Sequence, residues 1–243
     1  MSLLKNRTLL AATFGHFSVD MYSGMLPLIL LALTQPLGLS YTQVGLVSMA
    51  FSLAGSLSQP FFGWLGDRRG ARPMAVVGVA AIAIMVGMMR FVDSYAILIP
   101  LAIIAGLGSA AFHPQGASLA ARASDSQRGA AASIFMLGGN IGFAFGPLLN
   151  TAIFALTGDF MPETLAALGL AQAAIVYWAL ALQHREHIAR PRAPVTISFR
   201  RAAIGVILTL TMVMFLRAWV HSSIATYVPQ AFKTFGYSNA EAG

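Results

Sequence analysis

The stretch Gly63-Trp64-Leu65-Gly66-Asp67-Arg68-Arg69-Gly70-Ala71-Arg72 is a short basic connection between two long apolar segments. Apolar residues dominate 42–64 before its centre and 73–92 after it, and each segment is close to the roughly 20 residues that a helix needs to cross a bilayer. Gly70 suits a tight turn, because glycine adopts positive φ at little cost. The stretch therefore predicts two membrane-spanning helices joined by a charged loop.

The same pattern continues along the chain in both directions. Seven apolar stretches are long enough to span a bilayer, and they cover 8–33, 42–64, 73–92, 95–121, 129–156, 164–182 and 202–230. Of the 243 residues, 57% are hydrophobic and 9% are charged, whereas soluble domains carry about 25% charged residues. We therefore expect an all-α membrane protein. The first stretch is too long for the core of a signal peptide, so we interpret it as a retained helix.

Basic residues gather on one side of the alternating spans. That side carries Lys5, Arg7, Arg68, Arg69, Arg72, Arg122, Arg128, Arg185, Arg190, Arg192, Arg200 and Arg201, and the other carries Arg90 and Lys233. Because cytoplasmic loops are rich in Lys and Arg, we expect the N-terminus and the connections 65–72, 122–128 and 183–201 in the cytoplasm. The net charge of +7 then reflects membrane topology, so a lipid bilayer is expected as a partner and nucleic acid is not. With no cysteine, the chain has no disulfide framework and no thiol chemistry.

Five ionisable side chains lie deep inside the apolar segments, and these fall only on the first, fourth and seventh, whereas Arg90 lies at the end of the third. The five are His16, Asp20, His113, Arg217 and His221. An ionisable group in hydrocarbon is costly unless it faces a partner or a water-filled cavity, so we expect these three segments to line one polar path. His16 and Asp20 lie one helical turn apart. His16 and His113 lie equally far from the cytoplasmic ends of two antiparallel spans, which predicts that they share a depth.

The chain divides into three parts. Six segments with short connections occupy 1–182, a basic linker occupies 183–201, and a seventh segment begins the part 202–243. The seventh segment resembles the first, because the pair Arg217/His221 has the i, i+4 spacing of His16/Asp20 and because Pro229 corresponds to Pro27. The residues 236–243 also echo 38–45. A parallel repeat of this kind would make the chain one complete half and the first helix of a second, whereas chance similarity between amphiphilic helix ends is the alternative.

The connection 63–72 resembles motif A of the major facilitator superfamily, with Gly63, Leu65, Asp67, Arg68 and Gly70 in register. The resemblance implies a loop that latches the cytoplasmic side and takes part in conformational switching. Gly63 would then allow close helix contact and Asp67 would pair with a cation or a helix N-terminus. Arg68 and Arg72 would bind carboxylates or helix C-terminal carbonyls. A generic basic turn is the alternative.

Two further stretches are similar to motifs of the same superfamily. Gly142, Gly146 and Pro147 form a small-residue stripe with a kink-forming proline, which resembles motif C of antiporter-type exporters, although Leu148 and the residues after it replace the usual glycines. Ordinary small-residue packing is the alternative. The stretch 106–111 resembles the end of motif B, but its expected arginine is replaced by alanine, so we assign coupling to other groups.

A narrower resemblance is carried by His16-Phe17-Ser18-Val19-Asp20-Met21, Phe112-His113-Pro114, Gly138-Gly139-Asn140 and Gly146-Pro147-Leu148-Leu149. These residues are similar to the fosmidomycin-resistance branch of the superfamily, over most of residues 10–182. The resemblance implies two six-helix halves around a central cavity, of which this chain would hold the N-terminal six-helix bundle and the first helix of the C-terminal half. It also implies alternating access.

We therefore expect a proton-coupled secondary transporter of the plasma (inner) membrane that exports a drug or metabolite. Asp20, with His16 or His113, would carry protons. Substrate contacts are assigned to Arg217, His221, Gln115 and Asn140, with Arg217 meeting an anionic group. Four alternatives stay open: Asp20 in a fixed pair that joins helices, His113 neutral on a backbone carbonyl, Arg217 neutralising Asp20, and Asn140 bonding between helices.

Other classes of function remain as alternatives. Uptake by proton symport is the nearest, and a seven-helix receptor is opposed by the cytoplasmic N-terminus. A membrane enzyme with a metal at His16, Asp20 and His113 lacks any supporting HExxH or paired-carboxylate motif, so we expect no enzyme activity, metal or cofactor. The expected partners are the bilayer, protons, a small-molecule substrate and a missing C-terminal half.

Overall fold

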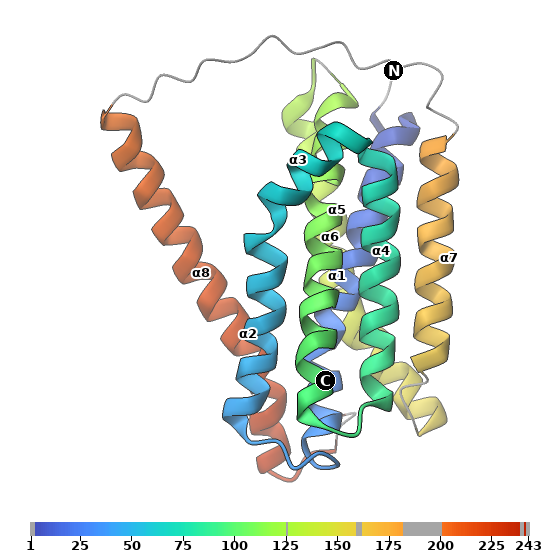
Figure 1. Ribbon diagram of the computed structural model, residues 1–243, viewed down its shortest axis with the longest axis vertical. Helices are drawn as coiled ribbons and strands as arrows, with labels where there is room; N and C mark the ends of the chain where they lie inside the picture. The colour runs from blue at the N-terminus through green and yellow to red at the C-terminus, as the bar shows by residue number, and fades with distance from the viewer. Residues whose placement is uncertain (1–2, 125, 159–161, 182–200, 239–240, 242–243) are drawn as a thin grey trace.

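The computed structural model describes residues 3–124, 126–158, 162–181, 201–238 and 241. The helices are α1 (Arg7–Thr34), α2 (Tyr41–Leu57), α3 (Gln59–Arg69), α4 (Ala71–Met88), α5 (Tyr95–Arg122), α6 (Arg128–Thr157), α7 (Pro162–Ala181) and α8 (Arg201–Thr234), with short 3-10 turns at Leu3–Lys5 and Met89–Phe91. Most of the helices are long and lie side by side, whereas α3 is short and lies at one end of the bundle and α8 diverges from the rest (Figure 1). The described residues contain no strand, so the predicted all-α class is confirmed.

Six of these helices are long and apolar enough to cross a membrane, and the bent pair α2–α3 counts as a seventh span. The single helix predicted over 42–64 is wrong in detail, because α2 and α3 meet at 43° around Ser58. Pro60 explains the bend: it has no N–H to donate to the carbonyl of Ser56, and its ring crowds that carbonyl. The break therefore follows from one proline that the apolar pattern hides.

The loop predicted over 65–72 is also wrong. Helix α3 continues to Arg69 and α4 begins at Ala71, so Gly70 alone makes the turn. Its φ of 96° and ψ of 141° belong to a region that residues with a Cβ rarely adopt. Most of the stretch quoted at the outset is thus helical, and its charged side chains project from the end of a helix.

Helix α1 is the central element of the bundle, buried along most of its length against α4, α5, α6 and α7. Its closest neighbour is α6, which has a glycine at every turn of the face that contacts α1. Gly138, Gly142 and Gly146 lie against the backbone carbonyls of Thr13, Phe17 and Met21. Because the pairs advance by four residues on both helices, α1 and α6 run parallel with their backbones in contact. The predicted small-residue stripe is therefore a packing surface.

The basic ends of the helices lie together, as the alternation predicts. The 3-10 turn at Leu3–Lys5, the α3–α4 turn and the end of α5 occupy one end of the bundle in Figure 1, whereas the α1–α2 and α4–α5 connections occupy the other. Arg201 begins α8 at the first end. The remainder of the predicted linker 183–201 lies outside the described residues.

Helices α1 and α8 end in the same way. The N–H of Gly38 donates to Gln35 and that of Leu39 to Thr34, and the equivalent bonds run from Gly236 to Lys233 and from Tyr237 to Phe232. Both glycines have positive φ, 59° and 91°. Ser40 and Gln43 then form a capping box, and Ser238 and Glu241 exchange the same reciprocal bonds. The backbone geometry therefore supports the repeat predicted between 38–45 and 236–243.

Helix α8 hydrogen-bonds to the bundle near its C-terminal end, and further back along the helix His221 lies against Phe143 of α6. Near the C-terminal end Thr226 bonds to Ser48 at 3.4 Å, and Gln230 to Thr34 at 3.3 Å. Towards the other end α8 diverges from α2, as Figure 1 shows. Its described side chains before Ser223 are exposed. The arrangement brings α8 against α1 and α2 at one end of the molecule and leaves the two sides apart at the end that carries the basic turns.

Candidate functional site

The histidine–aspartate cluster is built by two helices. Helix α1 presents His16 and Asp20 one turn apart, and α5 brings His113 to the same carboxylate. The Nε2 atom of His16 lies 3.2 Å from Oδ2 of Asp20, and Nε2 of His113 lies 3.2 Å from Oδ1. The two imidazole rings meet edge to face with their centroids 5.1 Å apart. The prediction that the two histidines share a depth is therefore confirmed.

A backbone carbonyl fixes the other nitrogen of each ring. Nδ1 of His16 lies 2.8 Å from the carbonyl oxygen of Phe135 on α6, and Nδ1 of His113 lies 2.8 Å from that of Ser109. A carbonyl oxygen only accepts, so each Nδ1 carries the hydrogen. In the neutral rings each Nε2 then has a lone pair, and both lone pairs face Asp20.

This arrangement needs positive charge between the rings and the carboxylate. An ionised carboxylate is an acceptor only, so a neutral Nε2 opposite it sets lone pair against lone pair. The contact is favourable once a proton sits on Nε2 or on the carboxylate, or once a metal cation is held between them. The cluster formed by His16, Asp20 and His113 is therefore a site for protons or a cation, placed inside two membrane-spanning helices.

Helix α6 supplies the wall of the cluster. The ring of Phe135 stacks on His16 with centroids 4.1 Å apart and planes 18° from parallel. A Cβ at Gly139 would come within 2.6 Å of Nε2 of His16 and of Oδ2 of Asp20, so only glycine leaves the cluster this room. Sequence reasoning did not assign Gly139 to the site. The sequence signal for Gly139 was the adjacent pair Gly138-Gly139 inside a predicted helix. The side chains that Gly139 faces, His16 and Asp20, lie over a hundred residues earlier in the chain.

The structure separates the residues predicted to bind substrate. Gln115 is 3% exposed and donates from Nε2 to the Phe62 carbonyl at 2.7 Å, so it joins α5 to α3. Asn140 is exposed on α6, and Arg217 is exposed on α8. His221 is exposed with its ring 5.1 Å from that of Phe143.

The contacts of Asp20 bear on two alternatives raised from the sequence. Among the described residues Arg217 forms no ion pair with Asp20, whose ion-pair partners are His16 and His113. His113 does bond to a backbone carbonyl, but it also contacts the carboxylate. Within the described residues, the carboxylate is thus paired by one histidine from its own helix and one from α5.

Two arginines of the stretch 63–72 have aromatic partners. The guanidinium of Arg68 lies 4.3 Å from the ring centroid of Trp64, and that of Arg72 lies 4.0 Å from the ring centroid of Tyr177 on α7. Asp67 is exposed and has no ion pair within the described residues. The two arginines thus have cation–π contacts in this conformation, and their pairing with carboxylates or helix ends stays a prediction. Gly63 only touches Pro114 at ordinary distance, whereas Gly66 gives room to Gln115.

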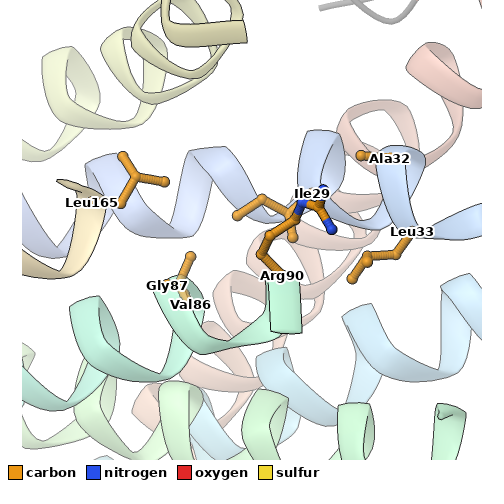
Figure 2. Close-up of a pocket in the computed structure, with 7 residues that line it drawn as sticks. All are labelled: Ile29, Ala32, Leu33, Val86, Gly87, Arg90 and Leu165. Carbon is orange, nitrogen blue, oxygen red and sulfur yellow. The ribbon is translucent and has the colours of Figure 1, made fainter. Parts of the chain in front are cut away.

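One small pocket lies apart from the cluster. Figure 2 shows it between α1, α4 and α7, with Arg90 among apolar side chains. Its lining residues are Ile29, Ala32, Leu33, Val86, Gly87, Arg90 and Leu165. None of the predicted site residues lines it, so the cluster around Asp20 stays the candidate site.

Long apolar helices around a partly buried carboxylate–histidine cluster define a polytopic α-helical membrane protein. The chain belongs to the Major Facilitator Superfamily, whose sequence profile matches residues 9–243. The seven-helix receptor considered above is set aside by this membership, and the superfamily is one of transporters rather than enzymes.

Curated relatives agree with this assignment. The fosmidomycin resistance protein of Escherichia coli is 28% identical over 224 residues, which cover 89% of this chain and 54% of that protein. The uncharacterized MFS-type transporter YfnC of Bacillus subtilis is 34% identical over 146 residues, 60% of this chain and 36% of its own length. A probable L-galactonate transporter of Escherichia coli is 29% identical over 160 residues, 65% of this chain and 35% of that protein. The chain thus matches about half the length of these relatives or less.

Solved structures share the fold. A bacterial homologue of the human drug peptide transporters superposes with a TM-score of 0.62 at 17% identity, covering 93% of this chain and 52% of that one. Tetrameric PepTSo2 superposes with a TM-score of 0.57 at 18% identity, covering 97% and 52%. The major-facilitator-type fold predicted from the sequence is confirmed.

Proposed function

We propose that this protein is a proton-coupled secondary transporter that exports a drug or metabolite by alternating access. The observation that carries the proposal is the pairing of Asp20 with His16 and His113 inside the spans of α1 and α5. Titratable groups at this depth are costly and mark proton relays and ion pathways in transporters. Membership of the superfamily supports transport in general, and the cluster supports protons as the coupling ion.

The cluster gives the proposal a chemical basis. Both Nε2 atoms and both carboxylate oxygens are already within reach of a shared proton, so one residue need not act alone. Binding of substrate nearby and loading of protons here would oppose each other, and this reciprocal coupling is what an antiporter requires. Arg217 and His221 on α8, with Asn140 on α6, are the proposed substrate contacts. Gln115 is already bonded to the backbone of α3, so we leave it out of this set.

Export is favoured over uptake by two observations. The glycine stripe with Pro147 is similar to the motif of antiporter-type exporters, and a relative that covers most of this chain is named for fosmidomycin resistance. An anionic substrate would suit Arg217. Uptake of a small anionic metabolite by symport is the second candidate, and it is supported by the likeness to a probable L-galactonate transporter.

We further propose the cytoplasmic (inner) membrane as the location, with the N-terminus inside. The basic turns support this orientation, because they gather at one end of the bundle. The length of the curated relatives supports a second half as the partner of α2 and α8. The bilayer, protons and a small molecule complete the proposed partners.

A vesicle experiment tests the proposal. Everted membrane vesicles from cells that express the gene are acidified by respiration and followed with a pH-sensitive dye. Addition of fosmidomycin is expected to release protons from the vesicles, and Asp20→Asn is expected to abolish the release. Asp93→Asn, which removes an exposed carboxylate between α4 and α5, is the matched control and should behave like the unchanged protein. Proton release that persists in Asp20→Asn would remove Asp20 from coupling, and substrate accumulation only with inward proton flow would favour the symporter.

A further inference from the structure

We propose that His16, Asp20 and His113 form a three-ligand site for a divalent transition-metal ion of the zinc class. From the sequence, a metal at these residues was considered only for a membrane enzyme and was set aside, because the chain has no metal-binding motif and the ligands are almost a hundred residues apart. The fold brings one ligand atom from each residue to within 4.8 Å of the others. The inference rests on this geometry and holds whether or not the transporter is coupled to protons.

Two of the distances between ligand atoms are compatible with a tetrahedral ion, one to each oxygen of Asp20. Both Nε2 atoms lie 3.2 Å from a carboxylate oxygen. Nitrogen and oxygen ligands of Zn²⁺ bind at about 2.0–2.2 Å, which places neighbouring ligand atoms about 3.3 Å apart around a tetrahedron. Strong charge-assisted hydrogen bonds are shorter, about 2.7–2.9 Å. Each of these two contacts therefore has the length expected between neighbouring ligands of one ion.

The second nitrogen of each imidazole ring, Nδ1, makes the kind of hydrogen bond that is typical of metal-binding histidines. Ligating imidazoles nearly always donate their other N–H to a carbonyl or carboxylate, which orients the ring and fixes the lone pair on the metal side. Here the carbonyls of Phe135 and Ser109 accept from the two Nδ1 atoms at 2.8 Å. Both Nε2 lone pairs consequently point at Asp20 without any rearrangement of the backbone.

Space and access also fit an ion. Gly139 faces Nε2 of His16 and Oδ2 of Asp20, where any Cβ would intrude. The side chain of His16 is 4% exposed, whereas those of Asp20 and His113 are 21% and 25% exposed, so the cluster opens on one side. Three protein ligands with an open fourth position are typical of zinc sites that exchange water or another ligand.

The donor set selects the class of metal. Two imidazoles and one carboxylate suit Zn²⁺, Co²⁺, Ni²⁺ or Cu²⁺, whereas Mg²⁺ and Ca²⁺ prefer sites made of oxygen ligands only. A divalent ion would also neutralise the carboxylate inside the bundle. An ion held here joins α1 to α5 and occupies the nitrogen and oxygen atoms that are proposed to bind protons. Micromolar Zn²⁺ would therefore inhibit transport. This consequence alone rests on the proposed function.

A titration with metal alone tests the site. The chain has five histidines, so His184, His187 and His221 are first replaced by alanine to leave His16 and His113. The purified, metal-free protein in detergent is titrated with Co²⁺ at neutral pH. We expect one equivalent to bind with the intense visible absorption of tetrahedral Co²⁺, Zn²⁺ to displace it, and Mg²⁺ to have no effect.

Ligand variants decide whether the ion sits in the cluster. Asp20→Asn and His113→Ala are each expected to weaken Co²⁺ binding at least tenfold, while Asp93→Asn leaves it unchanged. His16→Gln is added because it keeps a polar side chain against α6, and retention of helical circular dichroism shows that each variant is folded. Absent binding, or binding that survives both Asp20→Asn and His113→Ala, would overturn the inference. Neither result touches the vesicle assay, so failure of the metal site and failure of proton coupling are separate outcomes.

Discussion

Asp20 is the residue on which the site depends, because both histidines converge on its two oxygens from different helices. Removing the carboxylate leaves two imidazoles facing each other with nothing to share a proton or a cation. Removing one histidine leaves the other contact intact. We therefore expect variants of a single histidine to keep part of the proton release in everted vesicles, and the Asp20 variant to keep none.

Gly139→Ala is the residue-scale prediction that tests the room around the cluster. The new methyl group would meet the far end of the His16 ring and a carboxylate oxygen, both of which can shift without moving the backbone. We expect the free energy of unfolding to change by less than about 1 kcal/mol, since alanine also favours the helix by about that amount. Proton release in everted vesicles should nevertheless fall several-fold.

Gly129→Ala is the matched control for this change. Gly129 lies at the start of the same helix, and no atom lies within 4 Å of the position of a Cβ there. It should keep both stability and proton release. Equal activity of the two variants would show that the cluster does not need the space that Gly139 leaves.

At the scale of elements, α1 and α6 are held together by contact between their backbones. A Cβ at Gly142 would run into the carbonyl of Phe17, and both groups belong to helices that cannot yield locally. We predict that Gly142→Ala lowers the free energy of unfolding by about 1–3 kcal/mol, the usual cost of overpacking a core. The transition is followed by circular dichroism in detergent with increasing dodecyl sulfate.

Gly205→Ala in α8 provides the comparison, since nothing lies within 4 Å of a Cβ at that position. There the higher helix propensity of alanine acts alone, so stability should stay the same or rise slightly. A Gly142→Ala protein as stable as Gly205→Ala would mean that α6 can move away from α1 at little cost.

The contact of Arg72 with Tyr177 joins α4 to α7, and it carries a second prediction at this scale. Tyr177→Phe keeps an aromatic face and should retain stability, whereas Tyr177→Leu should lose about 0.5–2 kcal/mol, the usual range for a cation–π contact. The same dodecyl sulfate titration measures both. The same two variants are then compared in an Arg72→Gln background. If their stabilities become equal, the loss in Tyr177→Leu comes from the cation–π contact with Arg72. If the difference in stability persists, it comes from packing of the aromatic ring.

The apolar pattern was enough to place the spans, because hydrocarbon demands long uninterrupted segments wherever they occur. The meeting of His16 with His113 was also predictable, since equal depth in antiparallel spans is a matter of counting. The bend at Ser58 and the aromatic partners of Arg68 and Arg72 were not. These depend on one proline's local geometry and on which side chains the tertiary fold brings close, and neither leaves a periodic signal in the sequence.

At the scale of the whole molecule, the repeat between α1 and α8 is supported by the turns that follow these helices more than by the positions of their ionisable residues. Gly38 and Gly236 occupy the same place in two identical turns. Asp20 precedes its turn by 18 residues, but His221 precedes its own by 15, so the two ionisable pairs are not in the same register. The alignment of Arg217/His221 with His16/Asp20 thus needs a three-residue shift within the helix. Arg217 and His221 are accordingly better assigned to substrate than to a second copy of the proton site.

The orientation of the molecule in the membrane is the prediction that all the spans make together. The chain has no cysteine, so single cysteines report accessibility against a blank background. Ser126 lies between α5 and α6 at the end with the basic turns, and Asp93 lies between α4 and α5 at the opposite end. Because Lys and Arg mark the cytoplasmic side, we expect Asp93→Cys to react with a membrane-impermeant maleimide in intact cells. Ser126→Cys should react only after permeabilisation. The reverse pattern would invert every span and place the open end between α2 and α8 outside the cell, and reaction of both residues in intact cells would contradict the seven-span topology.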